Sequence, residues 1–515
     1  MNLDCDIAVI GAGFSGSLLS MALRRMGRRV VLIDRTQHPR FAIGESTTPL
    51  TNLLLEDFAK AFELPEVASL AKWGSWQRQH PELACGLKRG FTFYHHRMGE
   101  RFHDDAQHQS QLLVAASPSE PLADTHWYRP DFDHFLFQKA EALGTQCLLN
   151  TRVSGLVSSS EGCTLGLEQE GSSIALTARW VIDASGARGC LFRLLGLSEK
   201  PLPGLPRTQS LFAHFRGVKS TQSLEEFQSN LTPPYPPDAA ATHHLFEGGW
   251  IWVLPFNNRI TSAGVALMPE LAHHLNLSEG PAAWDRLLHR LPSVKRQFES
   301  SEAVTPFVHQ SLMPFSCSPI AGNAWSLLPS AAGFVDPLFS TGFPLTLLGL
   351  HRVASICREH WGQEIFRAEM EAYSDSVTQD LEHASRFIGA CYAQLGIPRR
   401  FAAMAKLYFA SVIYAETARR LGRPSLAGDG FLMRGHANYH DAMTGCLEIS
   451  RTASTEALES AVASAIAPID LGALNDPRWK NWIRVDFDAL RQARGKVGAT
   501  DEEIEALIQR AMQGG

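Results

Sequence analysis

Short apolar runs alternate with helix-periodic segments at the start of the chain. Ile7 to Ile10 and Val30 to Ile33 are uninterrupted apolar runs, the pattern of strands buried on both faces of a sheet. Between them, apolar residues recur from Leu18 to Leu23 at helical spacing. This order predicts a parallel βαβ unit.

The hydrophobic pattern changes along the rest of the chain. Trp180 to Ile182 and Trp325 to Leu328 predict further buried strands, and Trp250 to Leu254 carries large side chains at alternate positions. After about residue 343 the spacing becomes helical, and helices are predicted over 345–356, 363–387, 400–421 and 502–512. We therefore expect an α/β protein with α+β elements and a helical C-terminal portion.

The first turn carries a dinucleotide-binding fingerprint. Gly11, Gly13 and Gly16 follow the first strand directly, where they allow a tight turn, close approach of a pyrophosphate and close packing of helix on strand. The phosphates would lie at the helix N-terminus. Asp34 ends the second strand and suits a ribose hydroxyl. The fingerprint alone does not separate FAD from NAD.

Four later segments separate the two cofactors. They are Phe41 to Pro49, Arg129 to Asp133, Trp180 to Gly186 and Phe334 to Gly342. In this order they resemble the FAD-binding segments of the aromatic-hydroxylase-like flavoprotein fold. The resemblance implies cofactor contacts by Glu45, Ser46, Arg129, Asp183, Gly186, Asp336 and Pro337. Asp183 and Asp336 could also be only helix or turn caps.

The resemblance also implies a domain organisation. Residues 1–350 would form a Rossmann-like, FAD-binding, monooxygenase-like core. Mixed β-sheet insertions around 85–130 and 205–310 would face the substrate. Residues 351–515 would form a helical region that covers the substrate site.

Lys88 is the candidate catalytic residue. It lies between Gly86 and Gly90 and precedes the apolar residues Phe91 and Phe93, which predicts a strand that leads into the core. A lysine that points inward is costly unless it has a partner or a function. The alternative is an ordinary exposed lysine.

Two further motifs accompany Lys88. Trp250 and Trp252 have strand spacing and therefore share one face, ahead of Pro255. The spacing Phe334-x-x-Pro337-x-x-Ser340-x-Gly342 follows later. Together with Lys88, these motifs resemble the flavin-dependent halogenases. The alternatives are an ordinary core strand with two aromatic residues and a segment that only packs against the flavin.

The resemblance implies a reaction and its participants. FADH2 from a separate flavin reductase, O2 and chloride or bromide would give hypohalous acid through a flavin hydroperoxide. Lys88 would relay that acid to an aromatic ring. Halide would be held by the segment Ser340, Thr341 and Gly342, where converging backbone N–H groups make a reasonable anion site. Trp250 and Trp252 would be structural residues that wall the region between flavin and substrate.

Phe339 departs from one branch of the family. The halogenases that act on free tryptophan have a glutamate at this position, and Phe339 instead packs near the active site in the implied arrangement. We therefore expect a phenol- or pyrrole-type substrate, free or tethered to a carrier protein, as in secondary metabolite biosynthesis. Two alternatives stay open: a single-component FAD aromatic monooxygenase, and a flavin-binding protein that does not halogenate.

Composition excludes other classes of protein. The 515 residues are 45% hydrophobic and 19% charged, with a net charge of −6 and no basic stripe, so nucleic acid is not an expected partner. No apolar run approaches the length of a membrane helix. The nine cysteines have no metal or redox spacing, which favours free thiols, no metal site and a cytoplasmic location. A homodimer is left open.

Overall fold

Strand β1 (Asn2–Ile10) lies inside an eight-stranded sheet, as its apolar run predicts. In this computed structural model, which describes residues 2–513, β1 pairs in parallel with β2 (Val30–Ile33) and β10 (Ser172–Asp183). The strand order is β19-β20-β10-β1-β2-β7. The other strands of this sheet are β7 (Gln146–Leu148), β8 (Thr151–Ser158), β9 (Cys163–Gln169), β19 (Ala321–Gly322) and β20 (Trp325–Leu327).

Helix α1 (Phe14–Arg25) follows the glycine turn and packs against both α5 (Arg129–Ala142) and α11 (Gly342–Glu359). Its residues from Phe14 to Leu23 are all buried, so the helix lies between its neighbours and the sheet. The βαβ unit and the Rossmann-like FAD-binding fold expected from the sequence are confirmed.

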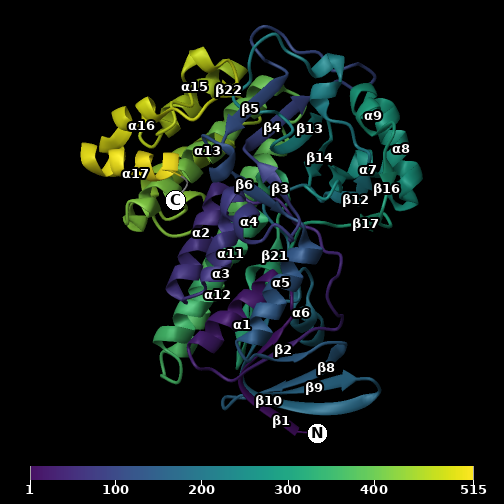
Figure 1. The fold of residues 1–515 in the computed structure, drawn as a ribbon, viewed down its shortest axis with the longest axis vertical. Helices are drawn as coiled ribbons and strands as arrows, with labels where there is room; N and C mark the ends of the chain where they lie inside the picture. Colours follow the sequence, from purple (N-terminus) through teal and green to yellow (C-terminus); the bar gives the residue numbers. More distant parts are fainter. Residues whose placement is uncertain (1, 514–515) are drawn as a thin grey trace.

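A nine-stranded, mostly antiparallel sheet forms the upper part of the molecule (Figure 1). Its order is β16-β12-β15-β14-β13-β4-β5-β22, with β17 also paired to β12. These strands are β4 (Gly90–His95), β5 (Gln111–Ala115), β12 (Gln209–Arg216), β13 (Ala241–Phe246), β14 (Gly249–Pro255), β15 (Thr261–Leu267), β16 (Glu302–Ala303), β17 (Val308–Gln310) and β22 (Trp482–Ile483).

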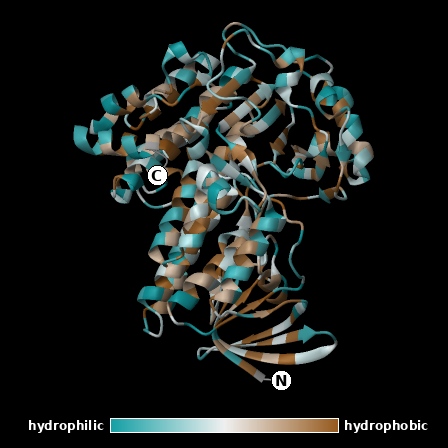
Figure 2. Ribbon diagram, in the orientation of Figure 1, coloured by the Kyte–Doolittle hydropathy of each residue, from teal (hydrophilic) through white to brown (hydrophobic). Residues whose placement is uncertain are grey.

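The two faces of this sheet bury different hydrophobic clusters. Trp250, Trp252 and Leu254 belong to the main core, whereas Ile251 and Val253 belong to a second cluster beneath α8 (Pro281–Arg290) and α9 (Pro292–Phe298). The two tryptophans therefore share the inner face, as their spacing predicts. In Figure 2 the strands of this sheet carry much brown, whereas the outer helices carry more teal.

Helices dominate the chain after α11. The long ones are α12 (Phe366–Tyr392), α13 (Pro398–Arg420), α14 (Ala437–Ile449), α15 (Thr455–Ile466) and α17 (Asp501–Gln513). The sequence missed one strand here, because β22 is too short to show a periodicity, and it joins the large sheet beside β5. Helix α11 runs unbroken through residue 350, so no break between elements marks that predicted boundary. None of the helices within residues 2–513 is both long and apolar enough to cross a membrane.

Candidate active site

Lys88 is completely buried. It ends strand β3 (Cys85–Lys88), which pairs with β6 (Asp124–Trp127) in a separate two-stranded ladder, and its exposed fraction is 0%. The alternative of an ordinary surface lysine is therefore wrong. A buried amine must be held by partners, because an unpaired charge in the interior is costly.

Three oxygens surround the Lys88 amine. Its Nζ donates to Ser46 Oγ at 2.9 Å, to the Thr47 carbonyl, and to Ser340 Oγ at 3.4 Å. The amine also lies 3.8 Å from the centre of the Phe91 ring, within the range of a cation–π contact. Lys88, Ser46 and Ser340 were predicted separately from distant segments, and the fold brings all three together.

Asp124 is a charged neighbour that the sequence did not reveal. It is the ladder partner of Lys88, and its Oδ1 accepts from Asn52 Nδ2 at 2.7 Å. Its Oδ2 is buried, with no hydrogen-bond partner among the described residues. Burial lowers the pKa of Lys88, while the Asp124 charge raises it. Burial likewise raises the pKa of Asp124, against the effect of Lys88.

The predicted halide segment has an unusual backbone. Phe339 and Ser340 both adopt left-handed conformations, with φ of 61° and 56°. Tyr408 Oη donates to the Phe339 carbonyl at 2.9 Å and fixes this turn. Within residues 2–513, no hydrogen bond uses the N–H of Thr341 or Gly342, and Thr341 does not cap helix α11 with its side chain. Such a turn presents backbone N–H groups to an anion.

The tryptophan pair is linked to the same segment by a buried chain of hydrogen bonds. Trp250 Nε1 donates to Tyr392 Oη at 3.0 Å, and Tyr392 donates to Asp336 Oδ2 at 2.8 Å. Asp336 Oδ1 accepts from the Leu338 N–H, so this carboxyl group caps the turn after Pro337. Burial raises the pKa of Asp336 to about 7. The predicted cofactor contacts of Asp336 and Pro337 remain predictions.

The glycine turn fits a dinucleotide. A Cβ at Gly11 would lie 2.6 Å from the Ala184 carbonyl oxygen, and one at Gly16 would lie 1.9 Å from the Gly11 carbonyl oxygen. Neither position tolerates a side chain, which agrees with the tight turn expected at Gly11, where φ is +103°, and with the close packing expected at Gly16. Gly13 is more open, and the first turn of α1 has no side-chain cap, so its N–H groups remain for a pyrophosphate.

Charged side chains surround Gly13. Asp34 Oδ2 accepts from the Ala12 N–H at 2.8 Å and pairs with Arg40 at 3.0 Å, which lowers the pKa of Asp34 against its burial. Arg129 makes a two-pronged ion pair with Asp133, at 2.7 and 2.8 Å, and donates to the carbonyls before Glu45. No pattern in the sequence indicated Arg40, because its contact with Asp34 depends on the folded loop.

Other predicted cofactor contacts have partners within the protein. Glu45 Oε1 lies 2.8 Å from His214 Nε2, but Glu45 Oε2 is buried without a partner among the described residues, which suits a bound group. Asp183 accepts from Ser185 and from the Leu191 N–H, so the cap expected as an alternative is present. Gly186 has a φ of +86° and open space beside it. The free N–H groups at α1 and the orphan Glu45 oxygen fit FAD.

A cavity of about 150 Å³ lies next to Lys88. Its wall includes the Phe91 ring, which the amine contacts, and Thr48, which follows the carbonyl that Lys88 binds. Tyr408 and Phe409 of α13 form another wall, and the segment from Leu471 to Leu490 contributes several residues. The helical C-terminal portion thus borders the candidate substrate site.

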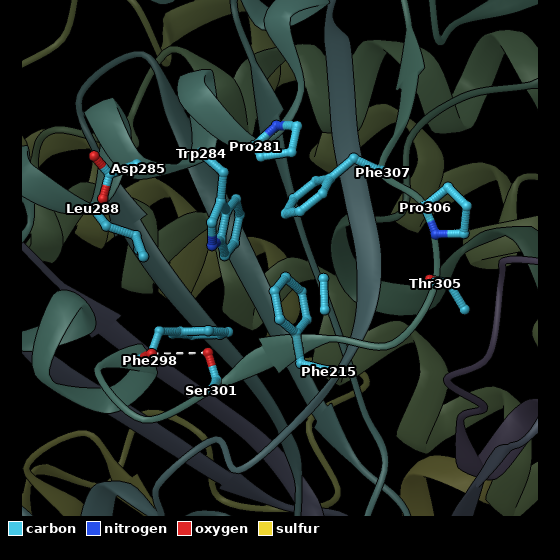
Figure 3. A pocket seen from close by; sticks show the side chains of 11 residues that line it. Phe215, Pro281, Trp284, Asp285, Leu288, Phe298, Ser301, Thr305, Pro306 and Phe307 are labelled. Carbon is cyan, nitrogen blue, oxygen red and sulfur yellow. Dashed lines mark hydrogen bonds between the residues drawn. The ribbon is translucent and has the colours of Figure 1, made fainter.

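A second, larger hollow of about 480 Å³ lies on the outer face of the nine-stranded sheet (Figure 3). Phe215, Trp284, Phe298 and Phe307 line it, and Ser301 Oγ donates to the Phe298 carbonyl at its edge. These rings belong to or pack against the outer cluster, not the core around Trp250. Asp285 is its one acidic lining residue, so the hollow lacks the buried charges found at Lys88.

Comparison with known proteins identifies the family. Residues 6–326 match the family model described as FAD dependent oxidoreductase. The chain is 32% identical over 383 residues to the tetracycline 7-halogenase of Kitasatospora aureofaciens, covering 73% of this chain and 67% of that protein. The chain belongs to the flavin-dependent halogenases. It is also 29% identical over 418 residues to monodechloroaminopyrrolnitrin halogenase PrnC of Pseudomonas fluorescens, covering 80% of this chain and 72% of the relative.

Solved structures support the fold of this halogenase. Halogenase PltM in complex with phloroglucinol and FAD superposes with a TM-score of 0.77 at 21% identity, covering 92% of this chain and 99% of that one. The flavin-dependent brominase Bmp2 superposes with a TM-score of 0.59 at 18% identity, covering 96% of this chain and 100% of that one. The protein is an oxidoreductase that uses FAD, O2 and halide, so the enzyme class and the cofactors expected from the sequence are confirmed.

Proposed function

We propose that this halogenase installs chlorine or bromine on a phenol- or pyrrole-type ring and that Lys88 directs the halogen to that ring. A separate reductase would deliver FADH2, because the sequence shows one glycine fingerprint and no second nicotinamide module. The enzyme would act in the cytoplasm on a free or carrier-tethered substrate. Relatives named as pyrrole-2-carbonyl carrier-protein chlorinase and brominase support the pyrrole option.

One observation carries the proposal. The buried Lys88 amine is held by Ser46, from a predicted flavin segment, and by Ser340, from the predicted halide segment. The same amine lies on the face of Phe91, whose ring also lines the 150 Å³ cavity. These contacts support a position for Lys88 between the elements assigned to flavin and halide and the cavity assigned to the substrate.

Each residue of the site has a separate task. Bound FAD, once reduced, would activate O2, and O2 would supply the oxidising equivalents that turn halide into hypohalous acid. Thr341 and Gly342 would hold halide by their N–H groups. Lys88 would receive the acid, either as a hydrogen-bond donor or as a free amine, and burial favours the amine by lowering the pKa of Lys88. Ser46 and Ser340 keep the amine in one orientation.

Because residue 339 is phenylalanine and not glutamate, the kind of ring that can react is restricted. Phe339 is fully buried and stacks on Tyr408, with ring centroids 4.8 Å apart. Its ring leaves no carboxylate at this point, so the substrate ring must be reactive by itself. Phenols and pyrroles meet this requirement because their heteroatoms donate electron density to the ring.

The test is halide-dependent product formation. Panels of phenols and pyrroles are incubated with FADH2, O2 and either chloride or bromide, and products are followed by mass spectrometry. We expect a mass increase that matches the halide supplied and vanishes without halide. A hydroxylated product that forms without halide would instead support a single-component type of oxygenation, and no oxygen consumption would support a flavin-binding protein without this activity.

A further inference from the structure

The cavity beside Lys88 is small. At about 150 Å³ it is well below the roughly 300–1,000 Å³ of pockets for drug-sized ligands. Apolar cavities of about this volume hold a molecule such as benzene. The cavity therefore has room for one aromatic ring with small substituents, and its walls include Phe91, Tyr408 and Phe409.

Two charged residues at the cavity already have partners. Asp486 accepts from the N–H groups of Asp488 and Ala489 at 2.9 Å, so it caps the following helix, α16 (Phe487–Ala493). Arg484 donates to the Thr232 carbonyl at 2.7 Å. Neither side chain therefore needs a ligand as a hydrogen-bond partner, and neither is fully available to bind one.

Glu416 is different from these two residues. It lines the cavity from helix α13, and its Oε1 accepts from Arg420 Nε at 2.8 Å. Arg420 also lies 3.4 Å from Glu56, which does not line the cavity. Within residues 2–513 no donor pairs with Glu416 Oε2. Arg420 balances the charge of Glu416, while the Oε2 atom of Glu416 remains available to a ligand.

Glu416 also acts on the surroundings of the Lys88 amine. Its charge raises the pKa of Asp124, which is the ladder partner of Lys88. The Phe91 ring contacts the amine on one side and lines the cavity that Glu416 enters. A ring that donates a hydrogen bond to Glu416 would thus lie in the cavity next to Lys88.

We propose that Glu416 determines substrate specificity by accepting a hydrogen bond from an O–H or N–H group attached to a single electron-rich ring in this cavity. The inference rests on the proposed function and narrows its substrate to monocyclic phenols and pyrroles with a free donor. A carboxylate that accepts this bond also increases the electron density of the ring. A methyl group in place of the donor hydrogen leaves Glu416 unpaired and adds bulk.

The experiment measures binding to the FAD-loaded protein by titration calorimetry. The ligands are resorcinol and 1,3-dimethoxybenzene, pyrrole and N-methylpyrrole, and 2-naphthol as a two-ring probe. We expect each donor-bearing ring to bind at least about tenfold more tightly than its methylated partner, the scale of a hydrogen bond to a charged group. We also expect 2-naphthol to bind about tenfold more weakly than resorcinol, because the second ring exceeds the cavity.

Two variants separate Glu416 from its surroundings. Glu416→Gln should bring the preference for donor-bearing rings below about threefold. Glu56→Gln is the matched control, because Glu56 contacts the same Arg420 outside the cavity, and it should keep the full preference. If Glu416→Gln does not fold, equal affinities within the wild-type ligand pairs would still overturn the inference.

Equal affinity for resorcinol and its dimethyl ether in the wild-type protein would overturn the inference, as would an undiminished preference in Glu416→Gln. These outcomes are independent of catalysis. A protein that binds resorcinol through Glu416 but never forms halogenated product contradicts the proposed function and leaves the inference intact. Halogenated product from a protein that shows no preference for donor-bearing rings would support the proposed function and contradict the inference about Glu416.

Discussion

Lys88 and Asp124 face each other as a residue pair in the β3–β6 ladder, and both side chains are buried. The charge of Asp124 favours the protonated form of Lys88, whereas burial favours the free amine. The pair therefore sets the pH at which Lys88 loses its proton. This relationship leads directly to a pH-dependent prediction.

Asp124→Asn should move the acidic limb of the pH profile of halogenation to lower pH. Loss of the carboxylate removes the interaction that raises the pKa of Lys88, so the free amine becomes populated at lower pH. We expect a shift of about one unit in the ratio of halogenated product to FADH2 oxidised. Other titratable groups near the pair are His126, His243, Tyr408, Glu416 and Arg420, and all of them remain in the variant.

The measurement compares wild type and variant from pH 5 to 9, with FADH2 oxidation recorded in parallel. Asn52→Ala is a second variant, because Asn52 stabilises the charged form of Asp124 by a hydrogen bond. Asn52→Ala should shift the acidic limb in the same direction as Asp124→Asn, but by a smaller amount. An unmoved limb in folded Asp124→Asn would show that Asp124 does not control Lys88.

The halide segment should be sensitive to bulk and insensitive to small polar changes. Gly342→Val should reduce halogenation at least about a hundredfold, because side-chain atoms would enter the space before the free N–H groups. A single Cβ at Gly342 meets only Phe334, at 3.8 Å, so the backbone itself tolerates it. Thr341→Ser is the control, since serine keeps the hydroxyl that donates to the Asp336 carbonyl. Full activity in Gly342→Val would place the halide elsewhere.

Arg129 should be important for stability as well as for FAD. Its partner Asp133 is fully buried, so Arg129→Leu leaves an unpaired carboxylate in the core and should cost about 3–5 kcal/mol. Chemical denaturation of the apoprotein checks this value, and FAD titration checks binding. Arg29→Ala, which removes an exposed pair with Asp4, should leave both measurements unchanged. Equal effects of the two variants would contradict the assignment.

The flavin should depend on an external supply of electrons. NADPH added to the purified FAD-loaded protein should not reduce the flavin at a useful rate, whereas a flavin reductase together with NADPH should restore halogenation. Absorbance of oxidised flavin follows the first step and mass spectrometry follows the product. Rapid reduction by NADPH alone would argue for a single-component enzyme.

Local patterns in the sequence were enough to predict much of this site. The glycine turn, the alternation of Trp250 and Trp252 and the inward course of Lys88 each depend on neighbouring residues, and the structure contains all three features. Asp124 was missed because strand pairing brings it to Lys88, and Glu416 was missed because helix packing brings it to the cavity wall, both across long sequence separations. No periodicity or motif records such contacts.

Two residues that were predicted as cofactor contacts have a structural role in the fold. Asp183 and Asp336 each cap the turn that follows them, which accounts for their positions without a ligand. An acid after a buried strand fits both a cap and a cofactor contact, so sequence alone does not choose between them. Strand β22 could not be predicted from the sequence either, because two residues are too few to reveal a strand periodicity.

The most direct test concerns the amine of Lys88. Lys88→Met keeps much of the buried volume and removes the amine, so the variant should fold, bind FAD and oxidise FADH2 as the wild type does. Lys88→Arg should also fail to halogenate, because a guanidinium stays protonated and has a different shape. Arg89→Met is the matched control at the adjacent position, which is less buried.

The deciding measurement is halogenated product per FADH2 oxidised, recorded for wild type, Lys88→Met and Arg89→Met under identical conditions. We expect normal FADH2 oxidation in all three proteins and at least a hundredfold less product only in Lys88→Met, an effect of about 2.7 kcal/mol. Near-wild-type product formation by folded, FAD-loaded Lys88→Met would contradict the central role of this residue.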